Sequence, residues 1–344
     1  MKHAYNAVGL VLFINLLMSI SAAAQSINTN PFNDGPYILI EGDKFISKSI
    51  ENGKVIVQRS EQTFPTDFAA EATYYQGVTH IAAISDIHGQ HDIFLNILKN
   101  NKVINQQHQW IYGDGHLVIT GDIFDRGPQV LDSLWFVFNL EQQAKAAGGK
   151  VHFLLGNHEY MVLRGRLDYL HPNYHQTATL LNTDYKALFN EQTVLGRWLR
   201  SKATVIKIND TVFLHGGIST KLLSSQLDLH DINQHFRASI GLSKTAVKQH
   251  PIYSQLHASS GPIWYRGYFD AGLTNTVVDQ ILSILKASRI VVGHTSGEEI
   301  KQLNDGRIFA VDTSIKNGED GEILLFNNQS AYRGTYTGEK IKLL

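Results

Sequence analysis

The sequence contains no cysteine among its 344 residues. This absence excludes disulfide bonds, so the folded chain depends on its core and on any bound metal for stability. It also excludes thiol nucleophiles and thiolate metal ligands. Any metal ion must therefore be held by histidine, aspartate, glutamate or asparagine side chains.

The chain also lacks a charge imbalance and a long basic run. It has 30 Lys and Arg residues against 31 Asp and Glu, a formal net charge of -1. Proteins whose main partner is a nucleic acid usually carry a strongly basic face, so we expect no nucleic-acid partner. After residue 24, no segment approaches the ~20 apolar residues that a membrane-spanning helix needs.

Residues 1–24 have the pattern of a secretory signal peptide. Lys2 precedes the almost wholly apolar run Ala7–Ile20, and Ala22–Ala24 offer a small-residue cleavage site before Gln25. The alternative is an uncleaved anchor, which is disfavoured because the apolar run is short for a membrane span. We therefore expect a periplasmic or secreted protein with no membrane attachment after cleavage.

The rest of the chain has the composition of an ordinary globular protein, with 43% hydrophobic and 18% charged residues. Residues 25–75 form a β-rich N-terminal extension in this interpretation, with short strands at Tyr37–Ile40, Lys44–Ile50 and Lys54–Arg59. Residues 76–344 alternate apolar strands with helical patterns and contain no repeat or flexible linker. They are expected to form one α/β domain (of the α+β type).

Polar side chains follow five apolar strands of this domain. The strands are expected at residues 80–84, 117–120, 151–155, 211–214 and 289–292, and each leads into a glycine-associated cluster. Polar residues often follow strands, but five such clusters are hard to attribute to chance. Neighbouring strand ends would bring the groups into one small volume. The groups are Asp86, His88, Asp122, Asn157, His158, His215 and His294.

Oxygen and imidazole ligands of this kind suit Mn, Fe or Zn better than Ca, which prefers oxygen alone. Seven groups are too many for one tetrahedral ion, so two divalent metal ions sharing a carboxylate are the economical interpretation. Such a pair activates a water and neutralises phosphoryl oxygens. Arginines hold the outer oxygens of a phosphate well, and Arg126 and Arg266 are candidates for this task.

The motifs resemble those of the calcineurin-like metallophosphoesterases. They are Asp-Ile-His-Gly from Asp86, Gly-Asp-Ile-Phe-Asp-Arg-Gly from Gly121, Gly-Asn-His-Glu from Gly156, His-Gly-Gly from His215 and Gly-His from Gly293. The Asp-Arg-Gly ending is that of the phosphoprotein phosphatase superfamily. The longer runs 156–165, 262–268 and 291–295 are similar to Shewanella-like bacterial protein phosphatases, including secreted cold-active protein-tyrosine phosphatases. The match covers about residues 80–326, and Ser85 stands where glycine is common.

The resemblance implies a fold and a role for each residue. The fold would be a central β-sandwich of two mixed sheets flanked by helices, in a metallophosphoesterase catalytic domain over residues 76–344. Asp86 and His88 would bind the first metal, Asp122 would bridge, and Asn157, His215 and His294 would bind the second. His158 would be the acid, oriented by Asp125; Arg126 and Arg266 would hold the phosphoryl group, and Arg164 would contact phosphate or cap a helix.

The predicted function is hydrolysis of phosphate monoesters by direct attack of a metal-bound hydroxide. The resemblance favours a phosphoprotein substrate, with phosphotyrosine ahead of phosphoserine and phosphothreonine, and a monomer is favoured. One alternative is hydrolysis of small phosphate compounds such as dinucleoside polyphosphates. A second alternative, from another class, is a non-catalytic metal-binding or adhesion protein on the same scaffold.

Overall fold

The computed structural model describes residues 32–328 and 330–343. The predicted signal peptide lies outside these residues. In the described part of the chain, no helix combines the length and the apolar character that crossing a membrane requires.

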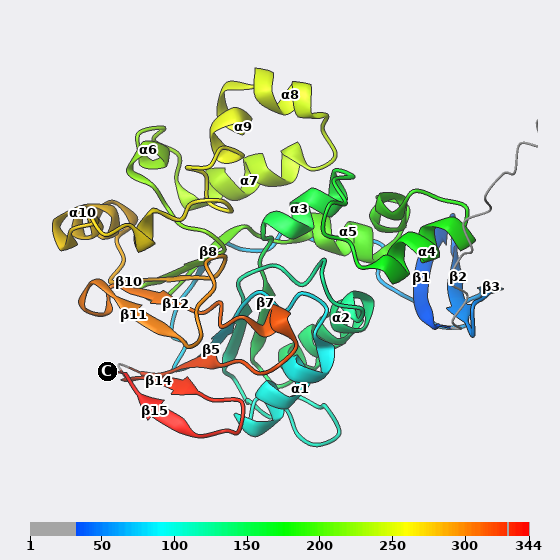
Figure 1. Ribbon diagram of the computed structural model, residues 1–344, viewed down its shortest axis with the longest axis horizontal. Helices are drawn as coiled ribbons and strands as arrows, with labels where there is room; N and C mark the ends of the chain where they lie inside the picture. The colour runs from blue at the N-terminus through cyan, green and yellow to red at the C-terminus, as the bar shows by residue number, and fades with distance from the viewer. Residues whose placement is uncertain (1–31, 329, 344) are drawn as a thin grey trace, which may run out of the picture.

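Two six-stranded mixed sheets form the centre of the molecule (Figure 1). In the first, the strand order is β15-β14-β13-β5-β6-β7, with bounds Lys340–Lys342, Ser330–Gly334, Ile323–Asn327, His80–Ile84, His116–Ile119 and Lys150–Phe153. In the second, the order is β11-β12-β10-β9-β8-β4, with bounds Lys301–Leu303, Ile308–Ala310, Arg289–Val292, Thr211–Leu214, Val205–Ile208 and Tyr74–Tyr75. Their packing confirms the predicted β-sandwich.

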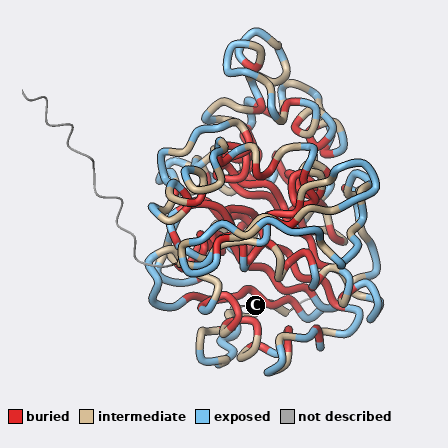
Figure 2. The backbone as a smooth tube through the Cα atoms, turned by 90° about the vertical axis from the view of Figure 1, so that its right-hand side faces the viewer, coloured by how far each residue is buried: buried red, intermediate tan, exposed pale blue. Residues whose placement is uncertain are grey.

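Alternation along each strand builds the layers, because successive side chains of a strand point to opposite faces. Ile81, Ala83 and Val118 of the first sheet meet Phe213 and Val291 of the second in one buried cluster. The alternate residues of each sheet face outward, onto helices. The centre of both sheets is consequently buried on both faces (Figure 2).

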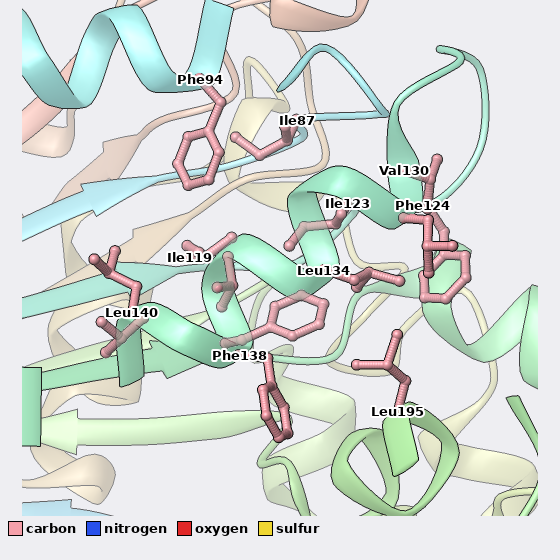
Figure 3. Packing of buried hydrophobic residues seen from close by; sticks show 14 of the residues in the cluster. Ile87, Phe94, Ile119, Ile123, Phe124, Val130, Leu134, Phe138, Leu140 and Leu195 are labelled. Carbon is pink, nitrogen blue, oxygen red and sulfur yellow. The ribbon is translucent and has the colours of Figure 1, made fainter. Parts of the chain in front are cut away.

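Helices cover the outer face of each sheet. The helices α1 (His91–Asn100) and α2 (Val130–Ala146) pack on the first sheet through Phe94, Leu134 and Phe138, which meet Ile119 in a continuous core (Figure 3). The helices α7 (Leu229–Ser239) and α10 (Asn275–Leu285) pack on the second sheet. The remaining helices are α3 (Asn157–Leu163), α4 (Pro172–Leu180), α5 (Val194–Ser201), α6 (Thr220–Leu223), α8 (Lys244–Gln249) and α9 (Pro251–Leu256).

A third, antiparallel sheet precedes the sandwich, where the sequence predicts three strands. It consists of β1 (Asp34–Glu41), β2 (Lys44–Glu51) and β3 (Lys54–Arg59). The amide of Ile40 donates to the carbonyl of Gln192, and the Trp135 indole donates to the carbonyl of Pro36, each at a distance of 2.8–2.9 Å. These bonds attach the third sheet to the helical layer.

One segment differs from the sequence-based expectation, and a second carried no expectation. The sequence predicts a helical stretch after Gly156–Glu159 that continues to about Tyr169, but α3 ends at Leu163, because Gly165 has a left-handed backbone with φ +81°. The loop that follows brings Tyr169 to Arg126, whose amide donates to the Tyr169 carbonyl at 2.9 Å. Residues 222–260, which carry no clear pattern, form a group of short helices.

Candidate active site

Five strand ends meet at one edge of the sandwich. The strands β5, β6 and β7 are parallel, as are β9 and β10, so the residues after them lie at the same end of each sheet. The two sheets come together there, because Nε2 of His215 lies 3.1 Å from Oδ2 of Asp122. All six predicted metal ligands are buried around this point, where a cavity of about 200 Å³ opens.

The backbone at this edge is held in unusual conformations. Gly121 has φ +107°, and a side chain there would meet the backbone nitrogen of Gly156 at 2.6 Å. Six of the predicted site residues also have positive φ, a conformation that costs energy in residues other than glycine and that clusters at functional sites. They are Asp86, His88, Asp122, Asp125, Arg126 and His294.

Asp122 stands between two groups of potential metal ligands. In the first group, Nε2 of His88 lies 3.7 Å from both Oδ1 of Asp86 and Oδ2 of Asp122. In the second, Nε2 of His215 lies 3.1 Å from Nδ1 of His294 and also contacts Asp122. Asp122 belongs to both groups, which is the position predicted for a bridging ligand.

Asn157 belongs to the second group. Its Oδ1 atom lies 2.9 Å from Nε2 of His215, and its side chain is 3% exposed. It is the first residue of α3, directly after Gly156, which has an extended backbone. The amide oxygen is thus one more oxygen donor aimed at the same point.

The contacts of two histidines show that this site fits cations. The Nδ1 atoms of His88 and His215 lie 2.7 and 2.9 Å from the carbonyls of Phe124 and Thr120, so each Nδ1 carries the hydrogen. In the neutral form of each ring, Nε2 presents a lone pair to the lone pairs of oxygen atoms such as those of Asp122. Such acceptors repel one another unless a cation lies between them. The donor set therefore fits divalent metal ions.

The protonation of His215 reflects the same demand for positive charge. Burial would lower its pKa, but the carboxylates of Asp122 and Asp86 outweigh burial and raise the pKa to about 9. A proton on Nε2 of His215 offsets the negative charge of these two carboxylates, and a metal ion at the same place would do the same.

His158 and Asp125 form the predicted pair. Oδ2 of Asp125 lies 2.5 Å from Nδ1 of His158, and both side chains are buried. The other nitrogen, Nε2, faces the cavity at 3.8 Å from Oδ2 of Asp122. Burial would lower the pKa of His158, but Asp122 and then Asp125 raise it above the ordinary histidine value. His158 is thus able to present a proton to the cavity.

Arg126 and Arg266 both line the cavity, whereas Arg164 does not. The guanidinium of Arg266 donates to the carbonyl of His294 at 2.5 Å, and that of Arg126 lies over the ring of Tyr169 at 5.1 Å. Arg164 is the residue that ends α3, and its guanidinium lies over the ring of Tyr160. It faces a neighbouring cleft instead.

Glu159, the last residue of the Gly-Asn-His-Glu motif, is buried and binds the backbone of the site. Its carboxylate accepts hydrogen bonds from the amides of Asp122, Ile123 and Gly156 at 2.7–2.8 Å, and a longer one from Phe124. A carboxylate with this many N–H donors fixes the backbone that carries Asp122.

Several residues near the site carried no prediction, and two of them affect the predicted site residues. Tyr169 is 44% exposed, and its ring lies 5.2 Å from that of His158. No sequence signal marks it. Asp312 is buried behind Asp86, and after burial itself its charge is the main cause that raises the pKa of Asp86 to about 8. Asp312 follows the apolar strand β12, so the pattern of strand ends was a usable signal for it.

Comparison with known proteins identifies the family of the chain. Residues 79–297 match the calcineurin-like phosphoesterase family. The chain is 29% identical to Shewanella-like protein phosphatase 1 of Plasmodium berghei over 68% of this chain and 67% of that protein. It is 23% identical to Shewanella-like protein phosphatase 2 of Arabidopsis thaliana over 76% of this chain and 78% of that protein.

A solved structure is more similar still. The cold-active protein-tyrosine phosphatase of a psychrophilic Shewanella species superposes with a TM-score of 0.88 at 40% identity, over 91% of this chain and 100% of that one. The match confirms the resemblance seen in the motifs. The chain therefore belongs to the calcineurin-like phosphoesterase family of metal-dependent hydrolases.

Proposed function

We propose that this protein is an exported protein phosphatase that uses two divalent metal ions and favours phosphotyrosine. The observation that carries the proposal is the shared position of Asp122 between two buried ligand groups, beside the His158–Asp125 pair. Asp86 and His88 would hold one ion, and Asn157, His215 and His294 the other. The names of the similar proteins, which are protein phosphatases, support the substrate class.

The ions, when bound, supply a water nucleophile at neutral pH and neutralise negative charge on phosphoryl oxygens. Side chains of the protein bind the phosphoryl group and supply the proton for the leaving oxygen. Arg126 and Arg266 bind the outer oxygens of the phosphoryl group, since guanidinium groups match their geometry. His158 donates the proton on Nε2 to the leaving oxygen, while Asp125 holds Nδ1 and stabilises the charged ring. The product alcohol or phenol then leaves protonated.

Two aromatic rings at the cavity support the preference for an aryl phosphate. Tyr169 lies beside His158, and the ring of Trp264 lies 5.8 Å from that of His294. Both line the cavity that the phosphoryl group would enter. The phenyl ring of phosphotyrosine can pack against such rings, whereas the short side chain of phosphoserine cannot.

Export is proposed on the sequence of residues 1–24 alone. The mature protein would then begin near Gln25 and act in the periplasm or outside the cell.

A substrate panel tests the proposed activity. Protein reconstituted with Mn, Fe or Zn is assayed with p-nitrophenyl phosphate, matched phosphotyrosine and phosphoserine peptides, and diadenosine tetraphosphate. We expect the phosphotyrosine peptide to have the highest kcat/KM of the three biological substrates. Much faster hydrolysis of the dinucleotide would show that the chain hydrolyses small phosphate compounds, and no hydrolysis at all would indicate a non-catalytic protein.

Replacement of Tyr169 tests the source of the preference. We expect Tyr169→Leu to lower the ratio of phosphotyrosine to phosphoserine turnover about fivefold, because an aromatic pair contributes about 0.5–1.5 kcal/mol beyond simple burial. Tyr74→Leu is the matched control, since Tyr74 is 51% exposed on β4. An unchanged ratio in Tyr169→Leu would contradict this role.

A further inference from the structure

A second cleft lies directly beside the candidate active site. Its volume is about 700 Å³, against about 200 Å³ for the cavity at the metal ligands. The two share three lining residues, Arg166, Trp264 and Arg266. A substrate whose phosphate lies at the metal ligands would therefore extend into this cleft.

The helices α8 and α9, with the segment that follows α9, build one wall of the cleft. They project from the end of the sandwich that carries the site, with α8 farthest out (Figure 1). Lys244 and Lys248 lie four residues apart on α8, so they share one face of that helix. Arg164 ends α3 on the opposite wall, one turn after the residues of the site.

The charged groups of the cleft all have the same sign. Five cationic side chains line it, and no carboxylate does in the described chain; the five are Arg164, Arg166, Lys244, Lys248 and Arg266. Within residues 32–328 and 330–343, Arg166 alone among them has a carboxylate partner, Asp168 at 2.6 Å. The cleft thus presents concentrated positive charge, in a protein whose overall charge is nearly zero.

The floor of the cleft is apolar and rigid. The ring of Tyr160 stacks on that of His257 at 4.0 Å, and Val247 is buried beside them. Ser239 also contacts Nε2 of His257 at 2.8 Å, which fixes the stack. A peptide backbone can lie on such a floor while its side chains reach the cationic walls.

We infer that this cleft binds acidic side chains next to the phosphorylated residue of the substrate, through Lys244, Lys248 and Arg164. The inference rests on the proposed phosphoprotein activity and adds a sequence preference to it. Charge complementarity favours acidic peptides, because like charges across an interface are costly. Peptides with basic residues at the same positions would be rejected.

Binding and turnover are measured separately to test this. Labelled peptides contain the non-hydrolysable difluoromethylphosphonate of phosphotyrosine, flanked either by glutamates or by glutamines, and their binding is followed by fluorescence anisotropy. The proteins compared are the metal-loaded wild type, Lys244→Gln/Lys248→Gln and the control Lys340→Gln/Lys342→Gln. The control lysines are exposed on β15, at the far end of the molecule (Figure 1). Turnover of p-nitrophenyl phosphate, which is too small to fill the cleft, is measured for all three.

We expect the wild type and the control variant to bind the glutamate peptide about fivefold more tightly than the glutamine peptide, since each exposed ion pair contributes modestly. The Lys244→Gln/Lys248→Gln variant should lose most of this difference and keep its turnover of p-nitrophenyl phosphate. With hydrolysable peptides, the change should appear in KM and not in kcat.

Each other outcome has a distinct meaning. Equal binding of the two peptides by the wild type, or an unchanged preference in the α8 variant, would overturn the inference. The inference would also be overturned if Lys244→Gln/Lys248→Gln weakened the binding of diadenosine tetraphosphate but not that of the glutamate peptide. Failure to hydrolyse p-nitrophenyl phosphate would overturn the proposed function, while the anisotropy still decides what the cleft binds.

Discussion

At the scale of single residues, the hydrogen-bond partner of Nδ1 in each histidine determines what its Nε2 can do. His88 and His215 place Nδ1 against backbone carbonyls, so Nε2 is the atom that each ring turns toward Asp122 and that the neutral ring offers to a metal ion. His158 instead donates from Nδ1 to the carboxylate of Asp125, which favours the charged ring. His158 thus differs in its chemistry from His88 and His215, because its Nδ1 partner is a carboxylate instead of a backbone carbonyl.

We expect His158→Asn to lower kcat for a phosphoserine peptide about 10²–10³-fold, since a positioned general acid contributes about that much. The loss for p-nitrophenyl phosphate should be much smaller, because p-nitrophenolate leaves without a proton. Steady-state assays of both substrates, with metal content measured in parallel, check this prediction.

The exposed residue His230 offers a matched control, and His230→Asn should leave both rates unchanged. Equal losses for the two substrates in His158→Asn, with normal metal content, would mean that His158 does not protonate the leaving group. A loss of metal in that variant would instead identify it as a ligand.

At the scale of elements, a buried polar chain attaches the segment before β4 to the first sheet. Glu71 accepts from Nδ1 of His152 on β7 at 2.9 Å, and Nε2 of His152 lies 3.0 Å from Nδ1 of His116 on β6. The ring of Tyr75 packs edge-on against both histidines. This chain of contacts joins residues 71–75 to two central strands.

The chain of contacts makes stability depend on pH. Burial, followed by His152 and Lys150, lowers the pKa of His116 to about 3, below the ordinary unfolded value of about 6.5. Between these two pKa values, the imidazole of His116 is protonated in the unfolded chain but neutral in the folded protein. The free energy of unfolding should fall as pH falls, by about 1.4 kcal/mol per pH unit for this histidine between about pH 6 and 4.5.

Urea unfolding of metal-free protein at several pH values measures this slope. We expect His116→Gln to reduce the slope by that amount, whatever its effect on stability at neutral pH. His230→Gln, in the exposed position, is the control. A slope identical to that of the wild type in His116→Gln would contradict the assignment.

At the scale of the whole molecule, the proposed metal ligands come from both sheets of the sandwich. Asp86, His88 and Asp122 follow strands of the first sheet, whereas His215 and His294 follow strands of the second. Asp122 and His215 face each other across this junction. Bound cations would therefore stabilise the pairing of the sheets as well as supply chemistry.

Removal of metal should accordingly lower both activity and stability. At a free metal concentration 100 times Kd, we expect each ion to add about 2.7 kcal/mol to the free energy of unfolding. Calorimetry of the protein after treatment with a chelator, and again after metal is restored, tests this. The midpoint temperature of thermal unfolding should fall when metal is removed and rise again when it is restored.

Variants at two aspartates locate the effect. Asp122→Asn should abolish the response of the midpoint to metal, while Asp114→Asn, at an exposed turn, should retain it. An unchanged midpoint after complete removal of metal, confirmed by elemental analysis, would show that the ions do not join the sheets.

The sequence by itself determined five central strands of the sandwich, β5, β6, β7, β9 and β10, and the candidate ligands that follow them. Apolar runs bounded by glycine specify buried strands locally, and the polar residues that follow them, such as Asp86 and Asp122, are adjacent in the chain. The α6–α9 helices escaped prediction because they are 4–11 residues long. Helices this short depend on tertiary packing and not on local propensity.

Only the tertiary structure decided which of these groups meet. The contact of Asp122 with His215 joins two sheets, and that of His158 with Asp125 joins the loop after β6 to α3. The cationic cleft likewise combines Arg164 with Lys244, which lie on different helices and share no sequence pattern. Such contacts depend on how layers pack, because charge and distance between groups remote in the chain are set by the fold and not by spacing.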